Sequence, residues 1–311
     1  MKNKEDIVVV GSVAFDDIQT NKGSEKRLLG GSGTYFSIAA SLFTKVHLVG
    51  VVGDDFEESH IELFNAKSIS TKYLSKEKGE TFHWGGIYSE DFSTRDTLFT
   101  KLGVFENFNP KVSTNDFDNP ILFLANIQPN LQMQMINQVT NANLVVLDTM
   151  NLWIENNYND LIQVIEKTDI LLINDEEILQ LTNKENINDA ARDLLKYGLK
   201  YVIVKKGSEG SLLVSQSSVA TIPAVPGIDV FDPTGAGDSF AGGFLGSLAS
   251  TVNKFNIEIN ESDDIIINSI IVGTAIASFT VSNFGINGIK NLQLHNIEKR
   301  IKLITDLMKG L

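Results

Sequence analysis

Cysteine is absent from this chain of 311 residues, and its four histidines are scattered without a metal-binding spacing. The chain can therefore form no disulfide, no thiolate zinc site and no cysteine nucleophile. Basic residues are also scarce, because 26 Lys and Arg against 39 Asp and Glu give a net charge of −13. This charge opposes a broad electrostatic contact with nucleic acid or with an anionic membrane, so we expect neither as a partner.

Long unbroken apolar runs are missing as well. The first apolar stretch, residues 7–10, is too short for a signal sequence or a membrane span, so we expect a cytoplasmic protein. Residues 262–281 are unusually apolar, but their polar interruptions favour a buried core helix. No linker rich in proline, glycine or serine divides the chain, which favours one domain over residues 1–311.

Short β-branched runs alternate with stretches of helical periodicity along the chain. The runs are continuously apolar, as is typical of strands buried on both faces of a parallel sheet. The order predicts a doubly wound α/β sandwich with extra C-terminal helices. The predicted strands are 7–10, 46–52, 121–125, 144–148, 170–174 and 201–204, and the predicted helices are 34–43, 56–66, 130–139, 158–167, 175–182, 188–197, 238–250, 263–281 and 295–309.

Two segments break this alternation. Residues 14–29 and about 80–103 are polar and aromatic with β character, and they have no obvious place in a buried parallel sheet. We interpret them as strands of a small lid. Solvated surface hairpins are the alternative.

The stretch DPTGAGDSFAGG, residues 232–243, places an acidic residue after a glycine-rich turn at the start of a predicted helix. A helix N-terminus presents unpaired amides and attracts anions. The amides of Gly235, Ala236, Gly237 and Asp238 can form a nest for phosphoryl charge, and Asp238 can accept a proton from an attacking hydroxyl. A capped helix start is the alternative, but a cap alone leaves the glycines unexplained.

Competing glycine motifs are not met. No Gly-Lys-Ser/Thr occurs, which excludes a P-loop nucleotidase. The pattern G-x-G-x-x-G fails because Phe36 and Phe240 stand at its last position, and G-x-S-x-G fails around Ser32 because Thr34 ends it.

The stretch DPTGAGDSFAGGF resembles the C-terminal signature of the ribokinase-like, or pfkB, family of carbohydrate and nucleoside kinases. Four more motifs follow the family's order: GSVAFDD at 11–17, GGSG at 30–33, NDEE at 174–177 and KKGSEG at 205–210. The resemblance covers about residues 11–288. It implies a ribokinase-like three-layer α/β/α sandwich with a central, mostly parallel sheet and a small β lid.

The resemblance also implies roles for individual residues. Asp238 corresponds to the general base, and Gly235, Ala236 and Gly237 to the anion hole. Asp16 corresponds to the carboxylate that binds sugar hydroxyls, beside the pocket floor at Gly30 and Gly31. Asn174 and Glu177 correspond to the element that organises Mg²⁺ through waters, although the same residues also suit a helix N-cap.

Nucleotide and cation contacts follow in the same way. The family's nucleotide loop corresponds to Lys205, Gly207, Ser208 and Gly210, and Lys205 is expected near the ATP phosphates unless it is a solvated loop lysine. Asp232 corresponds to an aspartate associated with a monovalent cation such as K⁺. Residues 277–288 resemble the adenine border, without assignment of single residues.

The acceptor pocket departs from the family pattern. Tyr35 stands where many members have an asparagine that bonds sugar hydroxyls, which puts the usual recognition of ribose in doubt. Aromatic residues in the lid segments, among them Trp84, suit either stacking on a base or lid packing. Further candidate contacts are Asn126, Gln128 and Asn151 near strand ends, and Arg95, which suits either an anionic group or the surface.

These observations lead to an expected function. We expect a kinase that uses ATP and Mg²⁺ to phosphorylate a primary hydroxyl of a small sugar. The alternatives are an adenosine-like nucleoside kinase of the same family and a non-catalytic sensor of sugars or nucleotides. A homodimer is expected, because lid strands in relatives often pair between subunits.

Overall fold

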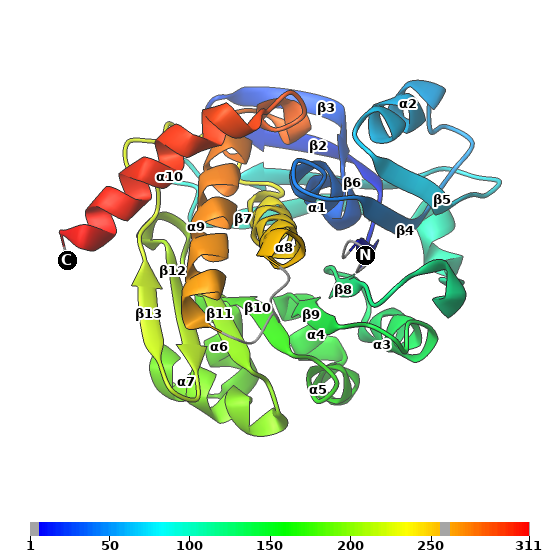
Figure 1. The fold of residues 1–311 in the computed structure, drawn as a ribbon. Helices are drawn as coiled ribbons and strands as arrows, with labels where there is room; N and C mark the ends of the chain where they lie inside the picture. Colours follow the sequence, from blue (N-terminus) through cyan, green and yellow to red (C-terminus); the bar gives the residue numbers. More distant parts are fainter. Residues whose placement is uncertain (1–5, 256–261, 311) are drawn as a thin grey trace.

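The structure is a computed structural model that describes residues 6–255 and 262–310. Within these residues nine strands form one large sheet, in the order β13-β12-β11-β10-β9-β8-β1-β4-β5 (Figure 1). Strands β11 to β5 of this order run parallel, and β12 and β13 add an antiparallel edge. The strands are β1 (Ile7–Val10), β4 (Val46–Val52), β5 (Ile69–Lys76), β8 (Ile121–Leu124), β9 (Leu144–Asp148), β10 (Ile170–Asn174), β11 (Tyr201–Lys205), β12 (Ser211–Ser215) and β13 (Val219–Ile222).

Helices cover both faces of this sheet, each over its own apolar core (Figure 1). Successive strand residues point to opposite faces, so Val9 packs into one core and Val8 and Val10 into the other. The predicted three-layer α/β/α fold is thereby confirmed. One face carries α1 (Ser32–Ala40), α2 (Glu58–Ala66), α8 (Ala236–Phe255), α9 (Asp263–Thr280) and α10 (Leu294–Lys309); the other carries α3 (Pro129–Gln138), α4 (Asn151–Asn156), α5 (Tyr158–Ile165), α6 (Asp175–Thr182) and α7 (Ile187–Leu194).

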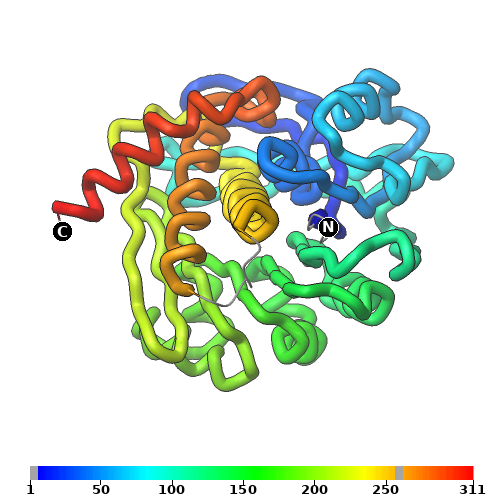
Figure 2. Tube along the Cα trace, viewed as in Figure 1, coloured from blue at the N-terminus to red at the C-terminus, as the bar shows by residue number. Residues whose placement is uncertain are grey.

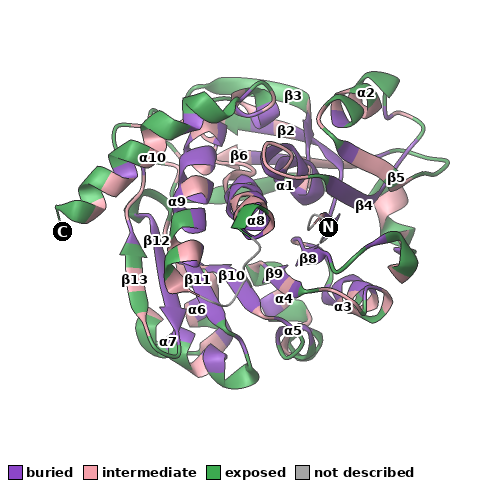
Figure 3. Ribbon diagram, in the orientation of Figure 1, coloured by how far each residue is buried: buried purple, intermediate pink, exposed green. Residues whose placement is uncertain are grey.

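Two glycines of the signature set the position of α8. A Cβ on Gly242 would lie 2.4 Å from the Phe36 carbonyl oxygen of α1, and one on Gly243 would lie 2.8 Å from Ile276 Cδ1 of α9. The missing side chains therefore let α8 pack closely against both neighbours, and Figure 3 shows α8 as mainly buried. This close packing holds the N-terminus of α8 at a fixed place over the sheet.

Four strands form a separate small sheet in the order β3-β2-β6-β7. Strand β2 pairs antiparallel with β3 and parallel with β6, so segments far apart in sequence lie side by side, as the blue and cyan parts of the tube in Figure 2 show. The strands are β2 (Ala14–Thr20), β3 (Gly23–Gly30), β6 (Phe82–Tyr88) and β7 (Arg95–Lys101). They come from the two segments that break the α/β alternation of the sequence.

Helix α9 contains most of the apolar stretch noted in the sequence. In the described part of the chain it is the one helix that is long and apolar enough, by length and composition alone, to cross a membrane. Of its most apolar window, 56% is buried inside the protein, and it packs against α8 and α10. The core-helix interpretation agrees with this packing.

The edges of the large sheet were not predicted. Strand β5 reads ISTKYLSK and is half-buried or exposed along most of its length, so it lacks the apolar run that marks the central strands. Strands β12 and β13 form an antiparallel hairpin at the opposite edge. Edge strands face solvent, and their composition therefore resembles that of loops.

Candidate functional site

The signature turn lies directly before α8, over the carboxyl ends of the parallel strands. Gly235 has a φ of +75°, a conformation that favours glycine. The Ala236 amide donates to the Pro233 carbonyl at 3.2 Å. The amides of Gly235 and Gly237 donate to no protein acceptor in residues 6–255 and 262–310. Of the four predicted anion-hole amides, those of Gly235 and Gly237 are thus free, that of Ala236 is engaged in the turn, and that of Asp238 faces its own carboxyl.

Asp238 lies in the first turn of α8 and is half-buried. Burial raises the pKa of its carboxyl to about 7, the charge of Asp148 raises it further, and Lys205 opposes the shift. A carboxylate with a pKa close to neutrality suits the role of a general base. The side chain is therefore neither withdrawn into the core nor held in an ordinary surface environment.

Tyr35 supports the turn from beneath. A Cβ on Gly235 would lie 2.4 Å from Cγ of the Tyr35 ring, so the ring lies flat against the glycine. The Tyr35 side chain is buried, and its hydroxyl has no hydrogen-bond partner among the described residues. Burial and the charges of Asp16 and Asp232 raise its pKa, so the hydroxyl stays protonated. Tyr35 therefore places a ring under the turn and an unpartnered hydroxyl near the acidic residues of the site.

Lys205 lies beside the same turn. Its Nζ is 2.7 Å from Asp148 Oδ1 and would be 3.2 Å from a Cβ on Gly237. Burial lowers the pKa of this lysine, but the Asp148 and Glu177 charges outweigh it and the net shift is upward, so the ammonium group keeps its charge. Lys205 is thus a fixed cation beside Gly237 of the signature turn and not a solvated loop lysine.

Asp148 is the residue of this cluster that sequence reasoning missed. It ends β9, and Asn174 and Lys205 end the next two strands of the sheet. The carboxyl ends of parallel strands meet at one edge, where ligands bind in open α/β sheets. The signal was available in LVVLD, because an acidic residue ends an otherwise apolar strand.

Asn174 and Glu177 form a capping box at the start of α6. The Glu177 amide donates to Asn174 Oδ1 at 2.7 Å, and the Asn174 amide donates to Glu177 Oε2 at 2.9 Å. Burial raises the pKa of Glu177 to about 7, and Lys205 opposes the shift. The helix-cap interpretation holds here, and the second carboxylate oxygen of Glu177 takes no part in the box.

The carboxylates of Glu177 and Asp148 fit a Mg²⁺ ion that is bound mainly through water and phosphate. The described residues contain no cluster of three or more Asp, Glu or His that could hold a metal ion. Mg²⁺ commonly keeps several waters and uses one or two carboxylates together with substrate phosphates. Glu177 and Asp148, beside Lys205, would supply such a sparse set.

Asp16 lies at the other end of the site, on β2 of the small sheet. It is 4% exposed. Burial raises its pKa to about 8, and the charges of Asp232 and Asp238 add to the shift, while the Gly31 amide lowers it. A Cβ on Gly30 would lie 1.9 Å from Asp16 Oδ2, so glycine at this position is what makes room for the carboxylate.

Gly31 closes the other side of this pocket. It has a φ of +91° and is the N-cap of α1, and a Cβ there would lie 2.5 Å from the Ser12 carbonyl oxygen. The same carbonyl accepts from the Gly33 amide at 2.9 Å. The Gly-Gly turn thus lets the β1–β2 and β3–α1 connections approach each other closely.

Trp84 and Tyr88 project from the same face of the small sheet as Asp16. Trp84 is the register partner of Asp16, and Tyr88 lies four residues further along β6. The half-buried indole lies over Gly86, whose Cβ would be 2.1 Å from it. The guanidinium of Arg95 lies 5.1 Å from the centre of the indole ring. Arg95 is exposed, and its contact with the indole places it on the same face of the small sheet.

The remaining predicted contacts are more dispersed. Asn126 Oδ1 accepts from Trp153 Nε1 at 2.8 Å, while Gln128 and Asn151 are exposed at the first turns of α3 and α4. Both Asp232 oxygens accept backbone amides at 2.9 Å, from Thr234 and Gly285. No substrate contact by these residues follows from the packing alone.

The nucleotide-loop residues lie after β11. Gly207 and Ser208 are exposed in the 3₁₀ turn η4 (Gly207–Glu209), beside the strand end that carries Lys205. Gly210 is buried with a φ of +91°, and a Cβ there would lie 2.0 Å from the Ile222 carbonyl oxygen of β13. Gly210 thus has a structural role in closing the β11–β12 turn.

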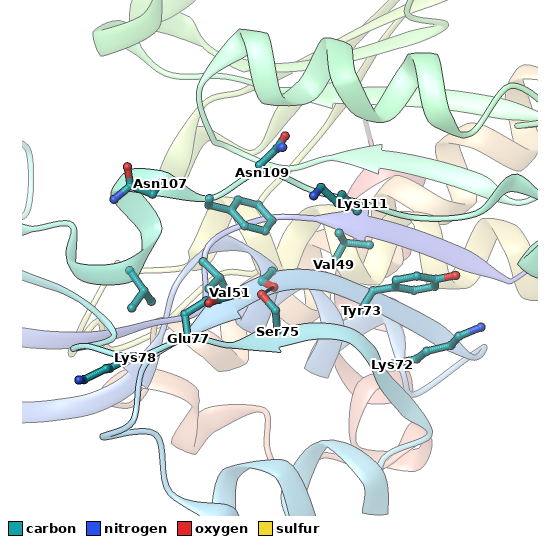
Figure 4. Close-up of a pocket in the computed structure, with 13 residues that line it drawn as sticks. Val49, Val51, Lys72, Tyr73, Ser75, Glu77, Lys78, Asn107, Asn109 and Lys111 are labelled. Atoms are coloured by element: carbon teal, nitrogen blue, oxygen red, sulfur yellow. Dashed lines mark hydrogen bonds between the residues drawn. The ribbon is translucent and has the colours of Figure 1, made fainter.

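A separate cleft of about 550 Å³ lies at the β4–β5 edge of the large sheet, opposite the β12–β13 edge (Figure 4). Strands β4 and β5 line it on one side, with Val49 and Tyr73, and Asn107, Asn109 and Lys111 line the other. It contains none of the predicted site residues.

A family model described as pfkB family carbohydrate kinase matches residues 4–291. The chain belongs to this family. Its pfkB fold is also found in solved structures. A nucleoside kinase from Methanocaldococcus jannaschii, described as an archaeal member of the ribokinase family, superposes with a TM-score of 0.74 at 23% identity, covering 96% of this chain and 99% of that chain. A putative ribokinase II from E. coli, solved with ATP and Mg²⁺, superposes with a TM-score of 0.73 at 16% identity, covering 96% and 99%.

Curated pfkB relatives are kinases. The chain is 30% identical over 249 residues to a cytidine kinase from Thermococcus kodakarensis, covering 77% of this chain and 87% of the relative. It is 26% identical over 266 residues to a nucleoside kinase from Methanocaldococcus jannaschii, covering 84% and 82%. Family membership and these relatives make the chain an ATP-dependent phosphotransferase with a small sugar or nucleoside as acceptor. The predicted enzyme class is confirmed, and the non-catalytic alternative loses its support.

Proposed function

We propose that this pfkB kinase phosphorylates the 5′-hydroxyl of a ribonucleoside. The observation that carries the proposal is the shared face of Asp16 and Trp84 on the small sheet. A buried carboxylate can accept hydrogen bonds from two ribose hydroxyls, and a half-buried indole next to it can stack on a base. A free sugar would use the carboxylate and leave the indole without a partner.

Two further observations support a nucleoside over a free sugar, the acceptor first expected from the sequence. Tyr35 presents a single hydroxyl in place of the family's asparagine amide, so one usual set of sugar contacts is missing. The cytidine kinase and the nucleoside kinase match most of this chain.

The chemistry assigns one role to each element of the signature turn. Asp238 accepts the proton of the attacking hydroxyl as the new bond to the γ-phosphorus forms and the bond to ADP breaks. The free amides of Gly235 and Gly237 and the Lys205 ammonium receive the charge of the transferred group. Bound Mg²⁺, held near Glu177 and Asp148, would neutralise charge on the ATP phosphates.

We also propose how the chain is organised for this reaction. Residues 1–311 act as one kinase domain, and the small sheet acts as a lid that covers the acceptor. The K⁺ site at Asp232, the homodimer and the cytoplasmic location stay predictions.

The first test is ADP release against a panel of acceptors. Cytidine, uridine, adenosine, guanosine and inosine are compared with ribose, fructose and their monophosphates. We expect at least one nucleoside to have a kcat/KM more than about 100-fold above ribose, because stacking adds about 1–3 kcal/mol and the second set of contacts adds to it. A free sugar as the best acceptor would reject the proposal and leave the kinase assignment intact.

The second test separates stacking from general lid packing. Trp84→Ala is compared with Phe99→Ala, whose side chain lies on the opposite face of the small sheet, because Phe99 pairs with Gly85. We expect Trp84→Ala to raise the KM for the nucleoside about tenfold or more and to leave the KM for ATP unchanged. An equal effect of both variants would mean that the indole only stabilises the sheet.

A further inference from the structure

Tyr88 links the small sheet to the signature turn. It is the last residue of β6, and its hydroxyl lies 2.9 Å from Thr234 Oγ1. Thr234 directly precedes Gly235, the first residue of the anion hole. The two hydrogen-bonding residues are 146 positions apart in sequence, so the contact exists only when the sheet lies over the turn.

The backbone around Thr234 is fixed from below and from one side. Its amide donates to Asp232 Oδ1 at 2.9 Å, and Asp232 Oδ2 accepts the Gly285 amide at 2.9 Å. The Tyr35 ring supports Gly235 from beneath. The small sheet contacts this turn through the Thr234 hydroxyl, and a shift of Thr234 would move the adjoining Gly235 amide with it.

An exposed ion pair also joins the small sheet to the body, and it is weaker than the hydrogen bond of Tyr88. Lys22 Nζ lies 2.8 Å from Asp229 Oδ1, but the two side chains are 35% and 66% exposed. Exposed ion pairs contribute little, because water and salt screen them. The Tyr88 hydroxyl is half-buried and neutral, since burial raises its pKa, and its bond to Thr234 is therefore less screened.

We propose that Tyr88 is a positioning residue: its hydrogen bond to Thr234 holds the Gly235 and Gly237 amides in place when the small sheet covers the site. Coverage of the acceptor and completion of the anion hole then occur together. Transfer to the acceptor is favoured over transfer to water, because the amides are in register only when the sheet excludes solvent. The inference rests on the phosphotransferase activity of the chain and not on the identity of the acceptor.

Tyr88→Phe removes the hydroxyl and keeps the ring. We expect kcat to fall about three- to tenfold, the range for one hydrogen bond, with the KM for ATP changed by less than about twofold. The ratio of ATP hydrolysed to acceptor phosphorylated should rise by a similar factor. Tyr73→Phe is the matched control, because the Tyr73 hydroxyl bonds Asp116 at the distant cleft, and it should change neither quantity.

The partner residue provides the decisive comparison. Thr234→Val should reproduce the effects of Tyr88→Phe, Thr234→Ser should retain wild-type behaviour, and the double variant Tyr88→Phe/Thr234→Val should be no worse than either single variant. The proposal is overturned by multiplicative effects in the double variant, by a Thr234→Ser variant as impaired as Thr234→Val, or by an unchanged hydrolysis ratio in Tyr88→Phe. Melting temperatures of all variants identify any loss that is due to unfolding alone.

Discussion

On the side of the site proposed to bind phosphate, here the phosphate side, Lys205 and Asp148 form an ion pair of 2.7 Å, and Asn174 and Glu177 bond each other in a capping box. On the side proposed to bind the acceptor, here the acceptor side, Asp16 is buried near the charges of Asp232 and Asp238, and the Tyr35 hydroxyl has no partner within the described residues. One side is assembled before any ligand arrives. The other has a buried hydroxyl, that of Tyr35, which only a ligand or water can satisfy.

The difference follows from what each side must bind. Every ATP molecule brings the same phosphates, so fixed amides and a fixed cation serve without rearrangement. The acceptor varies among family members, and its hydroxyls must complete hydrogen bonds that the protein leaves open. Specificity is strongest where an unsuitable ligand would leave buried polar groups unpaired.

The largest effect is expected at Asp238, the proposed base between the two sides. Asp238→Asn keeps the shape of the side chain and removes its ability to accept the proton. We expect kcat to fall about 100-fold or more with little change in the KM for ATP, measured by ADP release with saturating acceptor. Asp193→Asn, on α7, serves as a control for loss of one negative charge. Near-normal turnover of Asp238→Asn would remove the basis for dividing the site in this way.

The rigidity of the phosphate side can be tested at Gly235. Gly235→Ala places a methyl group 2.4 Å from the Tyr35 ring and strains a φ of +75°. Gly227→Ala meets the same kind of strain, at a φ of +69°, but has open space around it. We expect kcat to fall at least about tenfold in the first variant only, because the anion-hole amides shift.

In denaturant unfolding, Gly227→Ala should lose about 1–3 kcal/mol of stability from backbone strain, and Gly235→Ala should lose more, because its methyl group also clashes with the Tyr35 ring. Equal losses of activity would show that strain, and not the support from Tyr35, sets the position of the turn.

The buried carboxyl of Asp16 on the acceptor side makes the folding stability depend on pH. Burial raises the pKa of Asp16 from 3.8 to about 8, so between these values the native state holds a proton that the unfolded chain has lost. Stability therefore falls as the pH rises through this window. Carboxylates with lowered pKa, such as Asp17 and Asp55, change their contribution only below about pH 4.

We expect the ligand-free melting temperature to drop by about 2–4 °C between pH 6.5 and 8.5, and Asp16→Asn to remove about half of that drop, because Asp238 and Glu177, whose pKa values burial raises to about 7, lose protons in the same range. The range starts at pH 6.5 because His60, whose pKa is lowered by burial, contributes below it. A slope that is unchanged in Asp16→Asn would show that this carboxyl is already ionised.

The sequence predicted the central strands and brought the residues of the signature turn together, for a common reason. Apolar runs such as ILLIN mark strands buried on both faces, and the signature turn is local in sequence, so its glycines and Asp238 lie close together in any fold. Lys205 was placed through its motif. Its partner Asp148 was not, because two strand ends become neighbours only in the assembled sheet.

The acceptor side was less predictable. The role of Tyr35 as a support for Gly235 joins residues from α1 and the α8 turn, and the shared face of Asp16 and Trp84 requires the parallel pairing of β2 with β6. Neither contact has a sequence pattern, since both depend on tertiary packing. The same applies to the bond between Tyr88 and Thr234.

Four connecting segments join the small sheet to the body. They lie between β1 and β2, β3 and α1, β5 and β6, and β7 and η1 (Gly103–Asn107). A loop with two connections to the body can unfold and refold locally, whereas a sheet with four connections is expected to rotate as one unit. We therefore expect the acceptor to enter and leave by rotation of the intact sheet, with the amides that pair between its strands protected from hydrogen exchange throughout the catalytic cycle.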